Sequence, residues 1–328
     1  MTTITLGVDV GGTTTAVGAV TGEGAVLFDE HAPTHDGGPA SAERTIVGLI
    51  ESARARARRD GLQVIGIGIG VPAVVDPTTG ELGETHHVPD LSGQRLAAQL
   101  SGRLTLPVIV DNDVNALALG EWYFGSARGA RSLVVLAPGT GFGAGLVLDG
   151  RLVRGAAGFG GEFGHAPVKF DGPRCWCGGR GCLAVFASGR GIAEAARARV
   201  TTFPSPGLLQ KVDGDPARID APLVFRVARE GDVVAAAIVD DACRALGAMI
   251  ATIVNGLNPE AVVITGGVAS AFAALEARVL RAVADHAFAR ALAATRVSIV
   301  PGDKRLSMRG AAALALQAAG SGPEAGTA

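Results

Sequence analysis

One histidine and three cysteines lie within eighteen residues of this chain, in the order His165, Cys175, Cys177 and Cys182. The chain has only four cysteines, so three of them fall in this one stretch. Thiolate sulfur and imidazole nitrogen are the ligands that Zn²⁺ prefers, in a tetrahedral set of four. A Cys3His set leaves no coordination position open, so the sequence predicts a structural zinc site that folds a loop.

Two other interpretations of these residues are buried thiols without a metal and a disulfide. Cys175 and Cys177 are too close along the chain to pair without strain. The sequence shows no signal peptide, so we expect a cytoplasmic protein, whose reducing surroundings leave thiolates available to a metal. The glycines between Cys177 and Cys182 allow the tight turn that brings both ends of a short loop to one ion.

Length and charge limit the class of protein. A chain of 328 residues is long enough for two domains or one large bilobal unit. A net charge of −2 gives no basic face for nucleic acid, and the arginine-rich stretch 54–59 is interpreted as the solvated face of a helix. No apolar run is long enough to cross a membrane. We therefore expect neither a nucleic-acid nor a membrane partner.

Strand-like and helix-like segments alternate along the chain, which predicts an α/β fold. The segments 6–20 and 133–150 both read as strand, Gly-Thr turn and strand, and each turn is a candidate phosphate cradle. Their likeness suggests a duplicated fold. Further strands are expected at 64–75, 106–113 and 261–270, and helices at 42–59, 115–125, 233–257 and 309–319, the last folding back on the first lobe.

Five motifs occur in order along the chain. They are D-x-G-G-T at Asp9 to Thr13, N-D-x-N at Asn112 to Asn115, G-T-G-x-G at Gly139 to Gly143, E-x-G-H at Glu162 to His165 and C-x-C-G-x-x-G-C at Cys175 to Cys182. This series resembles the ROK family (repressors, open reading frames and kinases) of the actin-like ATPase superfamily.

The resemblance implies a two-lobed actin-like ATPase (ribonuclease H-like) α/β fold with a cleft between the lobes. The expected lobes are residues 1–115 with 305–328, and residues 116–304. It also implies an ATP-dependent, glucokinase-like sugar kinase that uses Mg²⁺, carries structural Zn²⁺ and forms a homodimer or homotetramer.

Phosphoryl transfer to an alcohol needs a carboxylate that accepts the hydroxyl proton, and Asp113 is the residue we expect in this role. Asp111 or Asp113 could instead simply cap the helix that follows. By resemblance, Asp9 holds Mg²⁺ through water, and the substrate contacts are Asn112, Glu162, His165, Asp90 and Ala73. The residues expected around the nucleotide are Asp9, Gly11, Gly12, Thr13, Thr14, Gly139, Thr140, Gly141, Gly143, Gly266 and Gly267.

Four positions depart from the family pattern. Leu183 and Ala184 follow Cys182, where the family continues to a glutamate that contacts the anomeric hydroxyl. The chain also has Pro72-Ala73 for Pro-Gly, Pro89 to Gln94 for P-N-L-x-G-W, and Thr14 for lysine. A ring without an anomeric hydroxyl does not need the missing glutamate. This favours a C7-cyclitol of the valiolone type, while an ordinary glucokinase or N-acylhexosamine kinase stays open.

A sugar-sensing regulator is the competing class, because many family members are repressors with an N-terminal helix-turn-helix. Here the first motif begins at Asp9 and neither end of the sequence is basic, so we expect no such domain. The presence of Asp9, Asp113 and the Gly-Thr-Gly loop argues against an inactive sensor.

Overall fold

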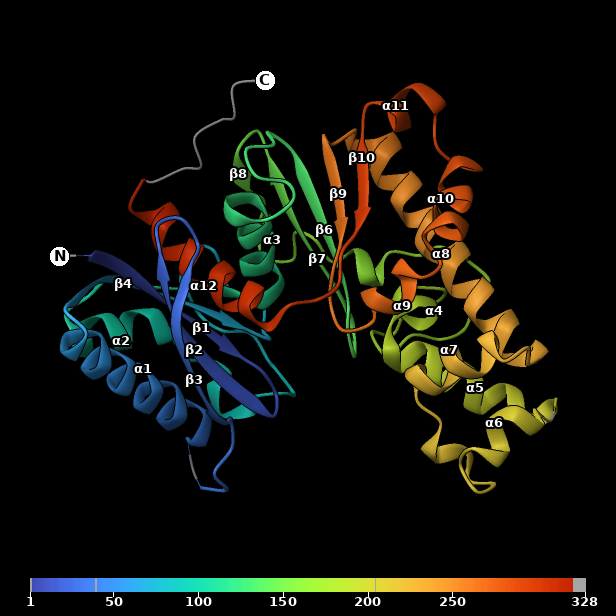
Figure 1. Cartoon of the computed structure of the whole chain (residues 1–328), viewed down its shortest axis with the longest axis horizontal. Helices are drawn as coiled ribbons and strands as arrows, with labels where there is room; N and C mark the ends of the chain where they lie inside the picture. The colour runs from blue at the N-terminus through green and yellow to red at the C-terminus, as the bar shows by residue number, and fades with distance from the viewer. Residues whose placement is uncertain (1, 39, 204, 321–328) are drawn as a thin grey trace. The chain divides into compact units, whose positions relative to one another are not determined.

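The computed structural model describes residues 2–38, 40–203 and 205–320. The chain forms two compact units (Figure 1). The first comprises Met1–Leu133, Gly145–Gly161 and Asp303–Ala328, and the second Val134–Ala144 and Glu162–Gly302. The boundary expected at residue 115 falls inside helix α3 (Asp113–Phe124), which lies entirely in the first unit. Residues 321–328 of the expected first lobe lie outside the described part of the chain.

The first unit is built on a five-stranded sheet of order β3-β2-β1-β4-β5. Its strands are β1 (Thr2–Val10), β2 (Thr14–Thr21), β3 (Val26–Pro33), β4 (Leu62–Val71) and β5 (Val108–Asn112). The hairpin expected over 6–20 is present as the antiparallel pair β1 and β2, while β1, β4 and β5 run parallel. The helices of this unit are α1 (Ser41–Arg59), η1 (Pro89–Leu91), α2 (Leu96–Leu104), α3 and α12 (Lys304–Ala318).

One face of this sheet forms an apolar core with α1. Alternate residues of β1, such as Leu6 and Val8, are fully buried together with Ile46 and Ile50 of α1. The arginines near the end of α1 lie outside this core. Arg56 covers the ring of Phe28 at 4.2 Å and pairs with Asp60, which fits the expected solvated face.

The opposite face of the sheet carries a row of glycines, and α12 packs directly on it (Figure 1). Gly7 of β1 lies opposite Gly18 of β2 and Gly68 of β4. A methyl group on Gly7 would overlap the carbonyl oxygen of Met308, and one on Gly68 would overlap that of Ala311. Only glycine therefore lets the backbone of α12 come this close to the strands.

The second sheet has the order β10-β9-β6-β7-β8. Its strands are β6 (Leu133–Pro138), β7 (Phe142–Leu148), β8 (Arg151–Leu152), β9 (Ala261–Ile264) and β10 (Arg296–Ile299). The remaining helices are η2 (Phe163–His165), α4 (Ala184–Ala187), α5 (Gly189–Thr202), α6 (Pro206–Gln210), η3 (Pro216–Arg218), α7 (Ala221–Arg229), α8 (Val233–Leu257), α9 (Ala269–Ala273), α10 (Glu276–Ala284) and α11 (Ala289–Ala293).

Helix α8 begins and ends as its sequence predicts. The side chain of Asp232 caps its first turn by accepting from the backbone N–H groups of Val234 and Ala235. Asn258 ends it in the left-handed conformation, directly before Pro259. Among the described residues, no helix combines the length and the apolar character that crossing a bilayer requires.

We predict that Gly68→Ala lowers the free energy of unfolding by about 1 to 3 kcal/mol or more, because the added methyl group forces α12 away from the sheet. Gly48→Ala on α1 is the matched control, since open space surrounds Gly48. It should raise the free energy of unfolding by up to about 1 kcal/mol through helix propensity. Urea denaturation of both variants measures the difference, and equal effects would contradict this account of the glycine row.

Candidate functional site

The carboxyl ends of three parallel strands bring the first group of predicted residues together. Asp9 of β1 lies opposite Gly70 of β4, which in turn lies opposite Asp111 of β5. Asp113 begins α3 directly after β5, and a methyl group on Gly70 would lie 3.3 Å from the Cα atom of Asp113. Gly70 therefore lets the backbone of Asp113 approach the strand next to Asp9.

The first turn of α3 is capped by Asn112. Its Oδ1 atom accepts from the backbone N–H groups of Val114 and Asn115, at 2.9 and 3.3 Å. Oδ1 of Asp113 also accepts from Val114, at 2.9 Å. The Nδ2 group of Asn112 donates to the carbonyl oxygen of Ala73 at 3.2 Å. Asn112 thus takes the capping role that the sequence left between Asp111 and Asp113, and joins the turn at Ala73 to the start of α3.

The turn between β1 and β2 presents backbone rather than large side chains. The N–H group of Gly11 donates to the carbonyl oxygen of Thr14 at 3.1 Å, and Thr34 Oγ1 donates to the carbonyl oxygen of Gly11 at 2.6 Å. Thr13 and Thr14 are both exposed. This arrangement holds the D-x-G-G-T turn in one shape and leaves its hydroxyls and outer surface accessible.

Asp90 has a structural role that the sequence did not reveal. Its Oδ2 atom accepts from the backbone N–H group of Ala42 at 2.8 Å, in the first turn of α1. The N-cap residue of that helix, Ala40, has no side-chain acceptor of its own. Asp90 therefore caps α1 from another segment. Its Oδ1 atom is buried and makes no hydrogen bond within the described structure.

In the second unit, three segments meet around the Gly-Thr-Gly loop that joins β6 to β7. The N–H groups of Gly189 and Arg190, at the start of α5, donate to the carbonyl oxygens of Gly139 and Thr140 at 2.8 and 3.0 Å. A methyl group on Gly139 or Gly141 would meet nothing within 4 Å. The carbonyl oxygens of the loop are thus held by α5, while the space around Gly139 and Gly141 is open, as an anion-binding loop needs.

The third segment is the Gly266-Gly267 turn after β9. The N–H group of Val268 donates to the carbonyl oxygen of Pro138 at 2.9 Å, which places the turn against the end of β6. Gly266 has φ of 135°, a conformation that favours glycine, and Gly267 borders open space. The hydroxyl of Thr265 is buried and has no hydrogen-bond partner in the described structure.

The predicted metal ligands converge in the second unit. The ligand atoms of His165, Cys175, Cys177 and Cys182 all lie within 4.8 Å of one another. Nδ1 of His165 is 3.6 Å from Sγ of Cys175, and Sγ of Cys177 is 3.7 Å from Sγ of Cys182. Cys243 does not belong to this cluster. The donor set and its spacing are compatible with one tetrahedral Zn²⁺ ion.

Two thiols of the cluster, those of Cys177 and Cys182, lie in surroundings that act on their ionisation in opposite directions. A backbone hydrogen bond from Gly179 lowers the pKa of Cys177, whereas burial, followed by the neighbouring thiols, raises the pKa of Cys182 to about 12. A divalent cation removes this conflict because it stabilises several thiolates at once.

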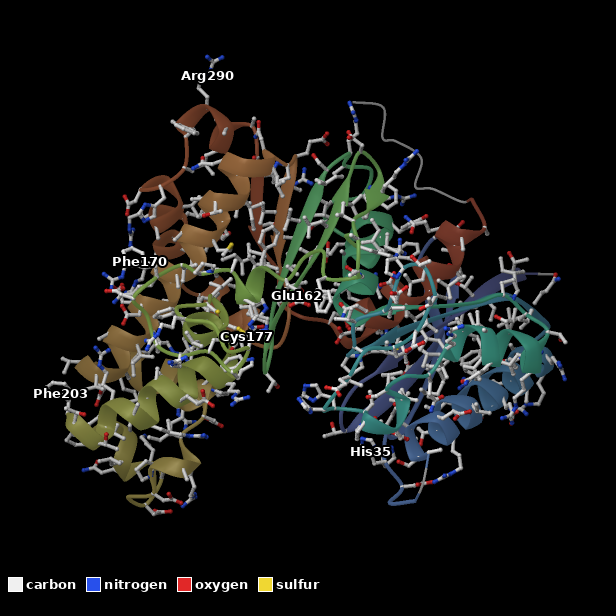
Figure 2. The ribbon with its side chains drawn as sticks, turned by 180° about the vertical axis from the view of Figure 1, so that it is seen from behind. His35, Glu162, Phe170, Cys177, Phe203 and Arg290 are labelled. Carbon is white, nitrogen blue, oxygen red and sulfur yellow. The ribbon has the colours of Figure 1, made fainter. Side chains whose placement is uncertain are left out.

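Glu162 and His165 lie on one tight turn beside the cluster, and Figure 2 labels Glu162 and Cys177. A methyl group on Gly164 would overlap the carbonyl oxygen of Phe142, so the turn packs against the start of β7. The carboxylate of Glu162 is exposed. The Trp176 ring lies edge-on to His165, and the guanidinium of Arg190 covers the Trp176 ring at 4.5 Å.

Ala184, at the position of the missing glutamate, has no exposed surface. It begins α4, and its carbonyl oxygen accepts from Ser188 Oγ at 2.7 Å. A methyl group on Gly191 would overlap the same carbonyl oxygen. The position is therefore packed, and its methyl side chain offers no hydrogen bond to a ligand.

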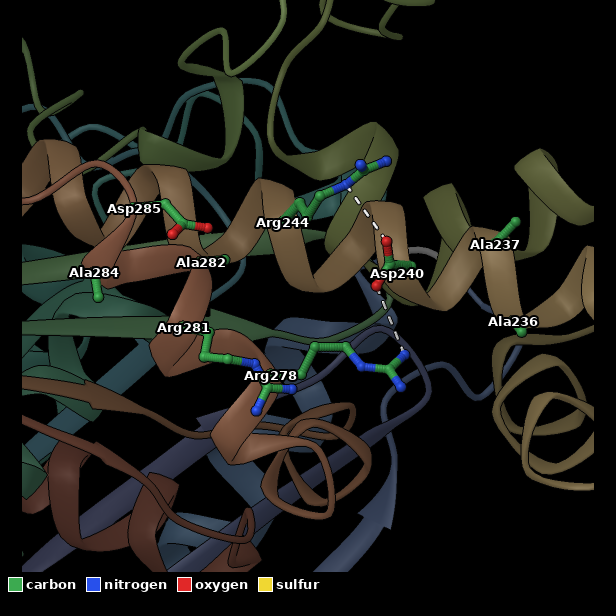
Figure 3. Close-up of a pocket in the computed structure, with 9 residues that line it drawn as sticks. All are labelled: Ala236, Ala237, Asp240, Arg244, Arg278, Arg281, Ala282, Ala284 and Asp285. Carbon is green, nitrogen blue, oxygen red and sulfur yellow. Dashed lines mark ion pairs between the residues drawn. The ribbon is translucent and has the colours of Figure 1, made fainter.

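A groove of about 680 Å³ lies apart from all of these residues, between α8 and α10 (Figure 3). Its lining includes three arginines and two aspartates. Asp240 pairs with Arg244 at 3.6 Å and with Arg278 at 3.8 Å. The arginine charges are thus partly neutralised by partners on the same surface, and no motif residue lines the groove.

The comparisons with known proteins agree with the motifs. A model of the ROK family matches residues 5–318. The glucokinase of Thermotoga maritima is 37% identical over 267 residues, which cover 81% of this chain and 82% of that protein. The xylose repressor of Caldicellulosiruptor bescii is 35% identical over 263 residues, which cover 79% of this chain and 64% of the repressor.

The fold has solved counterparts. The structure of a ROK family glucokinase from Streptomyces griseus, in complex with glucose and AMPPNP, has a TM-score of 0.69 and 31% identity, covering 96% of this chain and 99% of that one. The expected α/β class and the actin-like ATPase fold are thereby confirmed. From the motifs, the family match and the shared fold together, we conclude that this chain belongs to the ROK family.

Proposed function

We propose that this protein is an ATP-dependent kinase that phosphorylates a primary hydroxyl of a hexose or a hexose-like carbocycle. The strongest support is the position of Asp113. This residue is half-buried at the start of α3, and it lies next to Gly70 of β4, which is opposite Asp9 of β1. The similarity to the Thermotoga maritima glucokinase and to the Streptomyces griseus complex with glucose and AMPPNP supports the same reaction.

In this proposal Asp113 accepts the proton of the substrate hydroxyl while its oxygen forms a bond to the γ-phosphorus of ATP and the bond to ADP breaks. Asp9 would hold Mg²⁺, which neutralises phosphate charge when bound. The Gly-Thr-Gly loop would contact the phosphates, and the Gly266-Gly267 turn the adenosine. Asn112 already uses Oδ1 and one Nδ2 hydrogen bond within the protein, which leaves one N–H for the substrate.

The substrate's identity depends on the contacts around its ring. The carboxylate of Glu162 would accept hydrogen bonds from ring hydroxyls. His165 would bind zinc through Nδ1 and donate a hydrogen bond to a ring hydroxyl through its other ring nitrogen. Ala184 cannot replace the glutamate of the family, because it is a packed methyl group. This supports a C7-cyclitol as the substrate, whereas the similarity to the Thermotoga maritima glucokinase supports glucose as the substrate.

We predict that Asp113→Asn leaves folding nearly unchanged but lowers kcat by at least about a hundredfold, because the amide cannot accept the hydroxyl proton. Asp60→Asn, an exposed carboxylate at the end of α1, is the control and should keep normal turnover. A coupled assay of ADP release measures both. A folded Asp113→Asn variant with nearly unchanged kcat would remove Asp113 from the role of base.

For the cluster we predict one zinc ion per chain, bound by His165, Cys175, Cys177 and Cys182. Elemental analysis of the purified protein should give this content, and the double change Cys177→Ser with Cys182→Ser should abolish it. Cys243→Ser is the control and should retain the metal. Chelation should also alter the emission of Trp176, measured with Trp122 replaced by Phe, since Trp176 contacts His165. Retention of zinc by the double variant would place the ligands elsewhere.

We predict that a C7-cyclitol is used with a higher kcat/KM than glucose, because no side chain at Ala184 contacts an anomeric hydroxyl. The measurement is kcat/KM for glucose, mannose, N-acetylmannosamine and a valiolone-type cyclitol. A value for glucose of at least about 10⁴ M⁻¹s⁻¹ would instead identify an ordinary glucokinase. Binding of a sugar without any ADP release would favour a regulator.

A further inference from the structure

A buried carboxylate lies next to the proposed base and takes no part in the chemistry proposed above. Asp111 is only 3% exposed. Its Oδ1 atom accepts from the backbone N–H group of Asn112 at 2.8 Å and from Nδ2 of Asn115 at 2.9 Å. Its Oδ2 atom accepts from Nε of Arg154 at 2.6 Å. All of these residues belong to the first unit.

The loop that carries Arg154 is itself held in place. It follows β8, and the N–H group of Gly160 donates back to the carbonyl oxygen of Arg154 at 2.8 Å. Gly158 has φ of 83°, and a methyl group there would overlap the carbonyl oxygen of Val75, so the loop packs closely on that segment. Arg154 therefore presents its guanidinium to Asp111 from a fixed backbone.

The ion pair matters because Asp111 is connected to both sides of Asp113. Its Oδ1 atom holds the backbone of Asn112, directly before Asp113, and the side chain of Asn115 in the same helical turn. A buried carboxylate keeps its charge and orientation only when it is paired. Without Arg154, the unpaired carboxylate of Asp111 would turn toward water, and the first turn of α3 would lose two of its restraints.

We propose that Arg154 is a positioning residue for the reaction, acting through Asp111 on the turn that carries Asp113. This inference rests on the proposed kinase function. Small displacements of a base are costly, since about 1 Å of misplacement can slow a reaction about a hundredfold. The guanidinium suits this role because its planar donors hold a carboxylate in one orientation, which a lysine ammonium does not do.

The test is Arg154→Met, with Arg131→Met as the matched control. Arg131 belongs to the same unit and pairs with Asp149 at 3.1 Å, but both side chains of that pair are largely exposed. We expect Arg154→Met to lower kcat about tenfold or more per folded molecule, with KM for ATP changed less than about twofold. Arg131→Met should change neither. A folded Arg154→Met variant with normal kcat would overturn the proposal.

A double-mutant cycle separates positioning from general damage to the fold. Asp111→Asn keeps an Oδ1 acceptor for Asn112 and Asn115 but removes the charge that needs Arg154. In that background Arg154→Met should cost less than about threefold in kcat. An equal cost in both backgrounds would show that Arg154 does not act through Asp111. If Arg154→Met does not fold, Arg154→Lys takes its place, with the same expectation of lower kcat at normal thermal stability.

One readout does not depend on activity. Amide hydrogen exchange at Asn112 should be faster in Arg154→Met than in the unmodified protein, and unchanged in Arg131→Met. Unchanged exchange at Asn112 in Arg154→Met would overturn the proposal even if kcat falls. A lack of turnover by the unmodified protein on every sugar and cyclitol of the panel would instead overturn the kinase function, and exchange would still show whether Arg154 holds Asp111.

Discussion

The first unit depends on glycines in one face of its sheet, which leave no side chain between the strands and the backbone of α12 at those positions. Gly7, Gly18 and Gly68 form a row across three strands, and α12 rests on their backbone. Gly70 continues the same side of β4, and an added methyl group there would lie 3.3 Å from the Cα atom of Asp113, at the start of α3. An alanine at Gly7 or Gly68 would overlap the backbone of α12, so the packing of this helix on the sheet requires glycine at both positions.

Much of the fold follows from local signals in the sequence. Helix α8 has the bounds 233–257 that were expected, and it ends at Asn258, directly before Pro259. The β1-β2 hairpin and the metal cluster were likewise predicted from short motifs. The expected strand at 64–75 ends earlier, at Val71, because Pro72 interrupts the ladder. The catalytic and binding roles of the site residues stay predictions.

Long-range contacts could not be predicted in the same way. The cap that Asp90 provides to α1 joins residues 48 positions apart, and the pair of Arg154 with Asp111 joins residues 43 apart. Neither hydrophobic periodicity nor a short motif indicates that two residues so far apart in the sequence are in contact. The isoleucine-glycine alternation at 65–70 did hold a signal, since glycine on every second residue of a strand leaves one face bare for the close approach of another element.

The place of α12 along the chain has a consequence for biosynthesis. The sheet on which this helix rests is complete once β5 has been made, yet the helix itself follows the entire second unit. The ribosome therefore synthesises the five strands long before α12. Nearly two hundred further residues are made before this helix can pack on the glycine face of the sheet. During translation, this face of the sheet therefore lacks its packing partner until residues 304–318 have been made.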